Sequence, residues 1–355
     1  MRRSFSLVLL FLSLGFLAGC KAEVPEGQAQ RIIILTNGNS PFWDAAAKGA
    51  NDAAEEMKLA DNGFQVEIQR GDYKDKSQID KLKSYATAGD IAAVAISVTD
   101  DNNPAIADEM KALREAGIKV ITIDSDVNRE RNSDARFGYI GTDNVIAGRE
   151  LGKAAQTLVS EGDYAAFVGL KGASNAQARI KGFDEGAGSG ITRAKYLEDK
   201  GNDKAKEVVQ NNIDPSAPPK VLVGIWSYNT PAIVETVENQ GIRDQVTIVG
   251  FDADPPSIQY MNEGKVDALL VQNPYDMGYL GVKALHALAT ENDKVIKEIF
   301  PDHGSPEGDV HTTGLKIVVP DAEDRITKDL FREDTEFMTL SEFEDWLKKY
   351  GLTGS

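Results

Sequence analysis

The chain has 355 residues, of which 41% are hydrophobic and 7% aromatic, a globular balance that excludes wholesale disorder and a membrane-spanning bundle. This length exceeds that of one typical core, so two lobes are expected. The 56 acidic residues outnumber the 39 basic ones and give a formal net charge of −17, which argues against nucleic acid or anionic lipid as the main partner.

The N-terminus has the order of an export signal. Arg2 and Arg3 precede an apolar stretch from Leu7 to Gly19, and a charged start followed by a short hydrophobic run is typical of a signal peptide. The stretch is too short to span a bilayer, which takes about 20 residues. We expect residues 1–19 to be removed on export.

Cys20 follows directly in Leu17-Ala18-Gly19-Cys20. This sequence resembles the lipobox of bacterial lipoproteins, whose cysteine is acylated and becomes the mature N-terminus. The resemblance implies a lipidated Cys20, with residues 20–30 as a flexible tether. Because Cys20 is the only cysteine, disulfides, thiol catalysis and cysteine-ligated metals are excluded.

In the first half of the chain, apolar β-rich runs alternate with helical segments, the pattern of parallel sheets with crossover helices. The predicted strands are Ile32–Thr36, Phe64–Gln69, Ile91–Ser97 and Lys119–Asp124. The predicted helices lie near Phe42–Ala60, Ser77–Ala88 and Pro104–Ala116.

The second half repeats this rhythm. Its predicted strands are Tyr164–Gly169, Thr192–Leu197, Val221–Trp226 and Val246–Asp252. Its predicted helices lie near Asn144–Ser160, Asn175–Gly186 and Thr230–Gln240. The fold class is therefore α/β, with two similar halves. Near the C-terminus, Thr339-Leu340-Ser341-Glu342 has the form of a capping box and predicts a terminal helix that ends at Gly351.

Two aspartates occupy matching places in the halves. Asp124 ends the strand at Lys119–Asp124, and Asp252 ends the strand at Val246–Asp252. In open α/β sheets, ligands bind beyond the carboxyl ends of the strands. A lone aspartate there commonly caps a turn, but two in equivalent positions favour a binding site.

Two glycine patterns resemble phosphate-binding motifs, but neither has the required spacing and position. The glycines at 186, 188 and 190 precede a strand and lack the dinucleotide-binding spacing. Gly148-x-x-x-Gly152-Lys153 is one residue short of a phosphate loop and lies inside a predicted helix. Nucleotide hydrolysis has no support.

The sequence also lacks complete metal-binding and hydrolase motifs. His286, His303 and His311 have no metal-ligand spacing. Asp124-x-Asp126-x-Asn128 resembles the start of a calcium loop, but Arg129 and Ala135 stand where glycine and glutamate are required. Neither a Gly-x-Ser-x-Gly elbow nor a His-Glu-x-x-His helix is present, so we expect no enzyme activity, cofactor or metal.

The first strand is followed by Asn37-Gly38-Asn39-Ser40-Pro41-Phe42-Trp43, which sets two adjacent aromatic residues among polar ones. Aromatic faces stack on the apolar face of a sugar ring, and amides, carboxylates and arginine bond its hydroxyls. This mixture favours sugar recognition.

The chain resembles the periplasmic sugar-binding proteins of the ribose-binding type, which share their core with lactose-repressor-like regulators. The resemblance covers about residues 31–319. It is carried by Ser40-Pro41-Phe42-Trp43, Ile123-Asp124-Ser125-Asp126, Gly141-Thr142-Asp143-Asn144, Gln177-Ala178-Arg179-Ile180-Lys181-Gly182-Phe183, Val249-Gly250-Phe251-Asp252 and Val271-Gln272. These motifs are individually weak, but they occur in the family's order and at matching spacing.

The resemblance implies a set of ligand contacts. Phe42 and Trp43 would stack on the sugar, with Asn39 and Ser40 beside them. Hydroxyl partners would be Asp124, Asn144, Arg179, Asp252 and Gln272, and Tyr228 or Asn229 would line the same pocket. The alternative to ligand binding is a purely structural role for three of them: Asn144 would cap a helix, Arg179 would make a surface ion pair and Gln272 would fill a hinge turn.

Two positions depart from the ribose-binding pattern, which has asparagine in place of Ser40 and arginine in place of Ser125. Asp126 is expected to supply an extra acceptor beside Ser125. The ligand is therefore expected to be a pentose, a hexose or a cyclitol.

The resemblance also implies two doubly wound parallel-sheet lobes of the type I periplasmic binding protein, joined by three hinge crossings near Thr142, Gln272 and Gly314. The expected first lobe is 31–142 plus 273–314, the second is 143–272 plus 315–338, and 339–355 forms a C-terminal helix. A sugar that touches both lobes would select the closed state.

The implied function is delivery of a monosaccharide to an ABC permease by a monomer in the periplasm or on the cell surface, held to the membrane by its lipid alone. No nucleic acid is expected as a partner. The alternative is a sugar-sensing receptor that signals to a chemoreceptor or a kinase. A transcription regulator is disfavoured, because an export signal stands where a helix-turn-helix would be needed.

Overall fold

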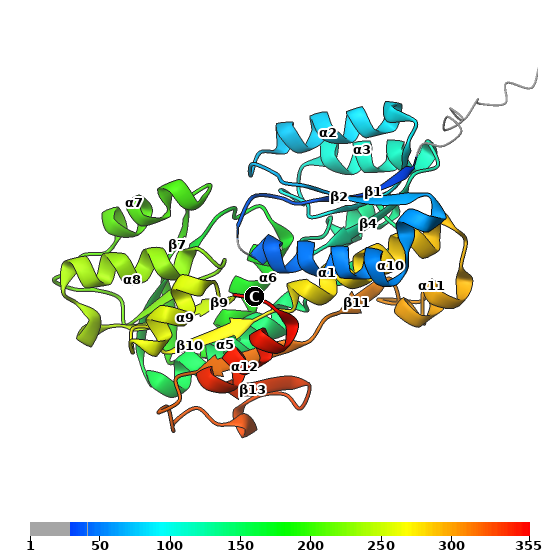
Figure 1. Cartoon of the computed structure of the whole chain (residues 1–355). Coiled ribbons are helices and arrows are strands. Elements are labelled where there is room, and N and C mark those ends of the chain that lie inside the picture. Colours follow the sequence, from blue (N-terminus) through cyan, green and yellow to red (C-terminus); the bar gives the residue numbers. More distant parts are fainter. Residues whose placement is uncertain (1–28, 41) are drawn as a thin grey trace, which may run out of the picture.

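The computed structural model describes residues 29–40 and 42–355. These residues form two lobes, each built on one β-sheet with helices on its faces (Figure 1). The predicted signal peptide, Cys20 and all but the last two residues of the predicted tether lie outside the described residues. Two α/β lobes with parallel sheets confirm the predicted fold class.

The first sheet has the strand order β2-β1-β3-β4-β5-β11, and all of its pairs are parallel. Its strands are β1 (Gln30–Leu35), β2 (Phe64–Gln69), β3 (Ile91–Ile96), β4 (Lys119–Ile123), β5 (Tyr139–Gly141) and β11 (Val310–Thr312). The helices of this lobe are α1 (Phe42–Glu56), α2 (Asp75–Ala88), α3 (Pro104–Glu115), α4 (Arg129–Asn132), α10 (Pro274–Ala289) and α11 (Asp293–Ile299).

The run of four apolar residues in β1 reflects burial on both faces of this sheet. Ile32 and Ile34 pack into the cluster formed with α1 and α10, whereas Ile33 and Leu35 pack into the cluster formed with α2 and α3. Successive side chains of a strand point to opposite faces, so a sheet covered on both sides needs a continuous hydrophobic strand. Figure 1 shows the two helix pairs on opposite sides of the sheet.

The second sheet has the order β7-β6-β8-β9-β10-β12-β13, and only β10 and β12 pair antiparallel. Its strands are β6 (Gly162–Val168), β7 (Ile191–Glu198), β8 (Val221–Gly224), β9 (Thr247–Phe251), β10 (Ala268–Val271), β12 (Leu315–Val319) and β13 (Thr335–Thr339). Its helices are α5 (Asn144–Leu158), α6 (Ser174–Ala187), α7 (Asn202–Asn212), α8 (Asn229–Gln240), α9 (Pro255–Asn262) and α12 (Leu340–Tyr350).

Helices α5 and α6 pack backbone against backbone. A Cβ added at Gly148 would lie 2.1 Å from the carbonyl oxygen of Arg179, and one at Gly182 would lie 2.0 Å from that of Val145. Only glycine permits this approach. The sequence Gly148-x-x-x-Gly152 therefore serves helix packing, and the packing fixes the position of α6, which carries Arg179.

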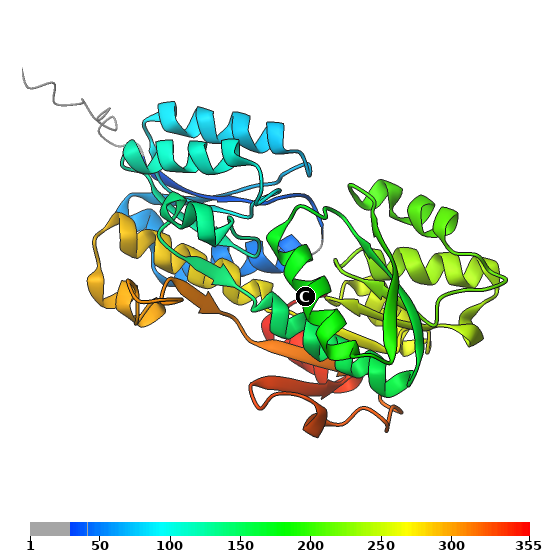
Figure 2. The same cartoon turned by 180° about the vertical axis from the view of Figure 1, so that it is seen from behind.

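The chain passes between the lobes three times, and these crossings lie side by side. They follow β5, β10 and β11, and Figure 2 shows the last one running from the first lobe to the second. The Thr142 hydroxyl donates to Gln272 Oε1 at 2.8 Å, and the Thr313 amide donates to the Gly141 carbonyl at 2.6 Å. These bonds join the first crossing to each of the other two.

Helix α12 begins with the predicted capping box. The Thr339 hydroxyl accepts from the Glu342 amide, the Glu342 carboxylate accepts from the Thr339 amide, and Gly351 ends the helix at a φ of 65°. The chain then reaches the second crossing, where the Ser355 hydroxyl donates to the Gln272 carbonyl at 3.1 Å.

Candidate functional site

A cavity lies between the facing carboxyl ends of the two sheets, and we call it the interlobe cavity. Both lobes and the second crossing contribute to its lining, which consists of Asn37, Ser40, Phe42, Trp43, Tyr73, Asp124, Asn175, Arg179, Trp226, Ser227, Tyr228, Asp252 and Gln272.

Aromatic side chains form much of the cavity wall. Phe42 and Trp43 begin α1, and their rings meet edge to face with centroids 5.0 Å apart. Trp226 and Tyr228 follow β8 in the second lobe. Aromatic faces on both sides of a small cavity suit a ligand with an apolar face of its own.

Asp124 belongs to the first lobe and is held from both lobes. Its carboxylate accepts from the Ser97 hydroxyl at 2.9 Å and from Asn175 Nδ2 at 3.2 Å. Burial raises the pKa of Asp124, and the Arg179 charge acts against that shift. The carboxylate is thus fixed in place while its charge is only partly compensated.

Arg179 projects from α6 with a side chain that is 1% exposed. Its Nε donates to Asn144 Oδ1 at 2.9 Å, and its Nη1 donates to the Ile225 carbonyl at 2.9 Å. The guanidinium carbon lies 4.4 Å from the centroid of the Phe251 ring. Nη2 has no hydrogen-bond partner among the described residues and lies 3.9 Å from Asp124 Oδ1, so a buried donor is left to bond a ligand oxygen.

Asp252 follows β9, the equivalent strand of the second lobe. Its Oδ1 accepts from Gln272 Nε2 at 2.8 Å, and Gln272 Oε1 in turn accepts from Thr142. Burial raises the pKa of Asp252 to about 6. A ligand contact at Asp252 is therefore linked through Gln272 to the crossings between the lobes.

Eight of the predicted site residues line the interlobe cavity. They are Ser40, Phe42, Trp43, Asp124, Arg179, Tyr228, Asp252 and Gln272. Their convergence follows from the topology, because the carboxyl ends of parallel strands meet at one edge of each sheet.

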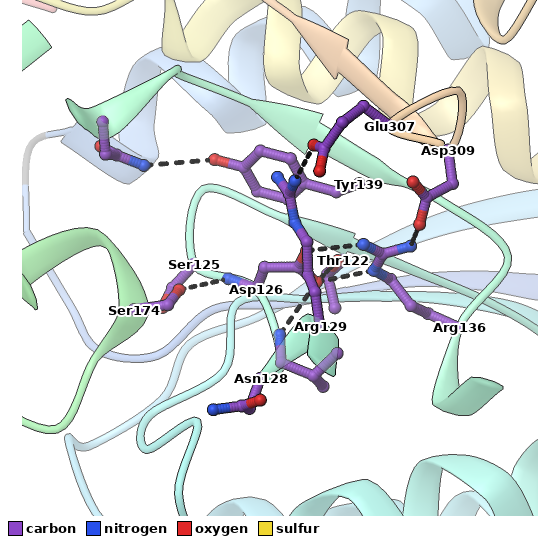
Figure 3. Close-up of polar contacts among 12 residues, drawn as sticks. Thr122, Ser125, Asp126, Asn128, Arg129, Arg136, Tyr139, Ser174, Glu307 and Asp309 are labelled. Atoms are coloured by element: carbon purple, nitrogen blue, oxygen red, sulfur yellow. Dashed lines mark hydrogen bonds and ion pairs between the residues drawn. The ribbon is translucent and has the colours of Figure 1, made fainter. Parts of the chain in front are cut away.

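Asp126 does not line this cavity, because its carboxylate is already used. Both of its oxygens accept from Arg136 at 2.7 Å, and Oδ1 also accepts from the Thr122 hydroxyl at 2.5 Å. Arg136 reaches on to Asp309 at 2.6 Å (Figure 3). The predicted extra sugar acceptor is instead half of a buried ion pair.

Four other predicted residues also lie outside the lining. Asn39 has an exposed side chain. The Ser125 hydroxyl bonds that of Ser174 at 3.1 Å (Figure 3). The Asn144 side-chain amide donates to the Thr142 carbonyl and accepts from Arg179 Nε. Asn229 donates to Asp199 at 2.6 Å and accepts from the Trp226 amide at 2.9 Å. Asn144 and Asn229 thus support lining residues from behind.

Five lining residues were not predicted: Asn37, Tyr73, Asn175, Trp226 and Ser227. Trp226 and Ser227 immediately precede the predicted Tyr228, and Asn37 follows the first predicted strand, so the strand-end rule could have included them. Asn175 stands at the start of α6, four residues before Arg179. Tyr73 lies in a loop that carries no sequence signal.

Two more buried carboxylates lie near the cavity. Asp254 is 3% exposed, and its Oδ1 has no hydrogen-bond partner among the described residues. Burial, reinforced by the Asp252 charge, raises the pKa of Asp254 to about 7. Burial also raises the pKa of Asp199 to about 6, and this residue accepts from the Tyr228 hydroxyl at 2.9 Å.

Within residues 29–40 and 42–355, no cluster of three or more histidine, cysteine, aspartate or glutamate side chains is arranged to hold a metal ion. None of the helices in those residues has the length and apolar character needed to cross a membrane.

Comparison with known proteins gives consistent matches. Residues 32–293 match the family model described as "Periplasmic binding protein domain". The chain is 26% identical to the ribose import binding protein RbsB of Escherichia coli, over 75% of this chain and 84% of that protein. It is 25% identical to the D-allose-binding periplasmic protein of E. coli, over 76% of this chain and 86% of that protein.

Among solved structures, the fold matches an ABC transporter solute-binding protein from Agrobacterium vitis with bound D-fucose. The TM-score is 0.72 at 21% identity, and the match covers 83% of this chain and 97% of that one.

Proposed function

Because the chain belongs to the periplasmic binding protein family, we propose that it binds a monosaccharide between its two lobes outside the cytoplasm and delivers it to an ABC importer. One observation carries this proposal: the interlobe cavity is lined from both lobes by aromatic rings and by buried carboxylate, guanidinium and amide groups. Rings fit the apolar face of a sugar, and the polar groups fit its hydroxyls.

The polar groups are arranged for hydroxyls, which both donate and accept. Arg179 Nη2 offers a donor that no described residue bonds, while Asp124 and Asp252 offer acceptors. We propose that one sugar bonds Asp124 from the first lobe together with Arg179 and Asp252 from the second. A ligand that touches both lobes favours their closure through its higher affinity for the closed state.

The ligand class that we propose is a pentose, a hexose or a cyclitol, and the protein binds it without turnover. The anionic surroundings of Asp252 and Asp254 disfavour acidic sugars and sugar phosphates. The crossings at Thr142, Gln272 and Gly314 act as the hinge, since they are the three places where the chain leaves one sheet for the other.

We further propose that the protein is a monomer held at the membrane, in the periplasm or on the cell surface, by a lipid on Cys20. The lipobox-like Leu17-Ala18-Gly19-Cys20 supports the anchor. A tether of about ten residues would leave both lobes free to meet a permease.

A thermal-shift screen tests the proposed binding. The panel is D-ribose, D-xylose, D-allose, D-galactose, D-fucose and myo-inositol, with D-glucuronic acid as the acidic control. A sugar at about 100 times its dissociation constant adds ~2.7 kcal/mol of stability, so at least one member of the panel should raise the unfolding midpoint clearly. A protein that responds to none of them, or to D-glucuronic acid alone, would overturn the proposal.

A further inference from the structure

The exposed part of the lining of the interlobe cavity lies at Ser40 and Tyr73. Eleven of its thirteen lining residues are buried, whereas Ser40 and Tyr73 remain partly exposed. A substituent on a bound sugar that points toward this part of the lining would have to pass these two side chains to reach solvent.

Tyr73 belongs to the first lobe but packs on the second. It lies between β2 and α2, and its ring joins the hydrophobic core of the second lobe. The ring stacks on Trp226, with centroids 6.0 Å apart and planes 29° apart, and it meets Tyr228 edge to face at 6.3 Å. A Cβ added at Gly201 would lie 3.6 Å from its ring. These contacts exist only while the lobes are together.

The backbone holds Tyr73 in this position against its own preference. Its φ is 60°, in the left-handed region that a bulky residue rarely adopts. The Tyr73 amide donates to the Asn37 carbonyl at 2.9 Å, and its hydroxyl donates to the Asn39 carbonyl at 3.0 Å. A Cβ at Gly38 would lie 1.9 Å from the ring, so Gly38 makes room for it. Strained residues of this kind gather at ligand clamps.

From these contacts we infer that Tyr73 is a specificity-determining residue, which closes the rim of the interlobe cavity and restricts it to a single unsubstituted sugar or cyclitol ring. The inference rests on the proposed function and adds to it an upper limit on the size of the ligand. A free ring lets Tyr73 reach Trp226 and the lobes close, whereas a glycoside substituent at the rim keeps Tyr73 and the second lobe apart.

The test is calorimetric titration of wild type and Tyr73→Ala with the six panel compounds and with the methyl α- and β-glycosides of the five aldoses. Wild type should reject at least one methyl glycoside of the sugar that it binds. Loss of the stack in Tyr73→Ala should weaken binding of the free sugar roughly 3- to 10-fold. It should also relax the discrimination against that glycoside tenfold or more.

Three further variants separate the effect of the Tyr73 ring from effects on folding. Tyr73→Phe keeps the stack and should discriminate like wild type. Gly38→Ala displaces the ring and should behave like Tyr73→Ala even if that variant folds poorly. Tyr260→Ala removes a partly buried ring elsewhere on the second lobe and should change neither affinity nor discrimination.

The outcomes separate the two claims. A wild type that binds none of these compounds overturns the proposed function, and this inference with it. A wild type that binds a free sugar, while Tyr73→Ala and Gly38→Ala discriminate against its glycosides as strongly as wild type does, overturns the inference alone.

Discussion

Asp124 and Asp252 occupy equivalent positions in the two lobes and share an unusual backbone conformation. Asp124 follows β4 with a φ of 60°, and Asp252 follows β9 with a φ of 65°. Each backbone amide donates to a carbonyl of the next strand, Ile140 in one lobe and Leu270 in the other. Both side chains line the interlobe cavity. The left-handed turn directs the two carboxylates toward each other's lobe.

This conformation predicts a difference between alanine and asparagine at these positions. Asparagine tolerates left-handed backbone better than alanine, for which it costs roughly 1–2 kcal/mol. We expect the free energy of unfolding without sugar to be at least about 1 kcal/mol lower for Asp124→Ala than for Asp124→Asn, and likewise at Asp252. Urea denaturation measures these free energies of unfolding. Equal stability of the alanine and asparagine variants at both positions would contradict the conformational argument.

Asp254 predicts a pH dependence of stability. Its folded pKa of about 7 lies above the ordinary value of 3.8. The stability associated with this shift is therefore present below pH 3.8 and is lost as the pH rises through 7. Asp254→Asn should be about as stable as wild type at pH 4 and ~2–4 kcal/mol more stable at pH 8.

Urea denaturation at pH 4, 6 and 8 tests this expectation. Asp108→Asn, which removes an exposed carboxylate on α3, is the control and should show no such trend. If the difference between Asp254→Asn and wild type does not change with pH, folding does not raise the pKa of Asp254.

Asn144 is expected to act through Arg179. It does not line the cavity, but its Oδ1 accepts from Arg179 Nε. Asn144→Ala removes that partner from a buried guanidinium, and sugar affinity should fall about tenfold. Calorimetry measures the loss, with Asn212→Ala as a control at the end of α7. Wild-type affinity in Asn144→Ala would mean that Arg179 holds its position without Asn144.

Asp126 should matter for folding and not for binding. Its partner Arg136 has a fully buried side chain, and removing one member of a buried pair typically costs ~3–5 kcal/mol. Asp126→Ala should lose stability of that order while its sugar affinity stays within about threefold of wild type. Asp80→Ala, which breaks the exposed pair with Lys76, should cost less than about 1 kcal/mol. A large loss of sugar affinity with unchanged stability would show that Asp126 takes part in sugar binding.

Cys20→Ser should abolish lipidation and release the protein from the membrane. Metabolic labelling with radioactive palmitate, followed by fractionation, compares this variant with wild type. Equal incorporation of palmitate into both would rule out Cys20 as the acylated residue.

The sequence predicted eight of the strands, β1 to β4 and β6 to β9, mainly from apolar runs of the kind that a parallel sheet covered on both faces requires. It missed β5, β10, β11, β12 and β13. These strands are only three to five residues long, so each carries too few residues to show a readable period. The strand-end rule located Asp124 and Asp252, because the carboxyl ends of parallel strands share one edge.

The rule could not tell which neighbours of a strand end face the cavity. Asp126 and Asn229 follow their strands as closely as lining residues do, but Arg136 and Asp199 hold them elsewhere. Those partners lie 10 and 30 residues away along the chain. Tyr73 reaches the cavity only through a contact between the lobes, and no local pattern encodes such a contact.

The central claim is that one sugar is bound by both lobes at once. Its most direct test is calorimetric titration of the panel sugar with the largest thermal shift into wild type, Asp124→Asn in the first lobe and Asp252→Asn in the second. Each substitution removes a charged acceptor of sugar hydroxyls, so each should weaken binding by ~2–4 kcal/mol, or roughly 30- to 1,000-fold. Near-wild-type affinity in both variants would contradict the claim and place the sugar elsewhere.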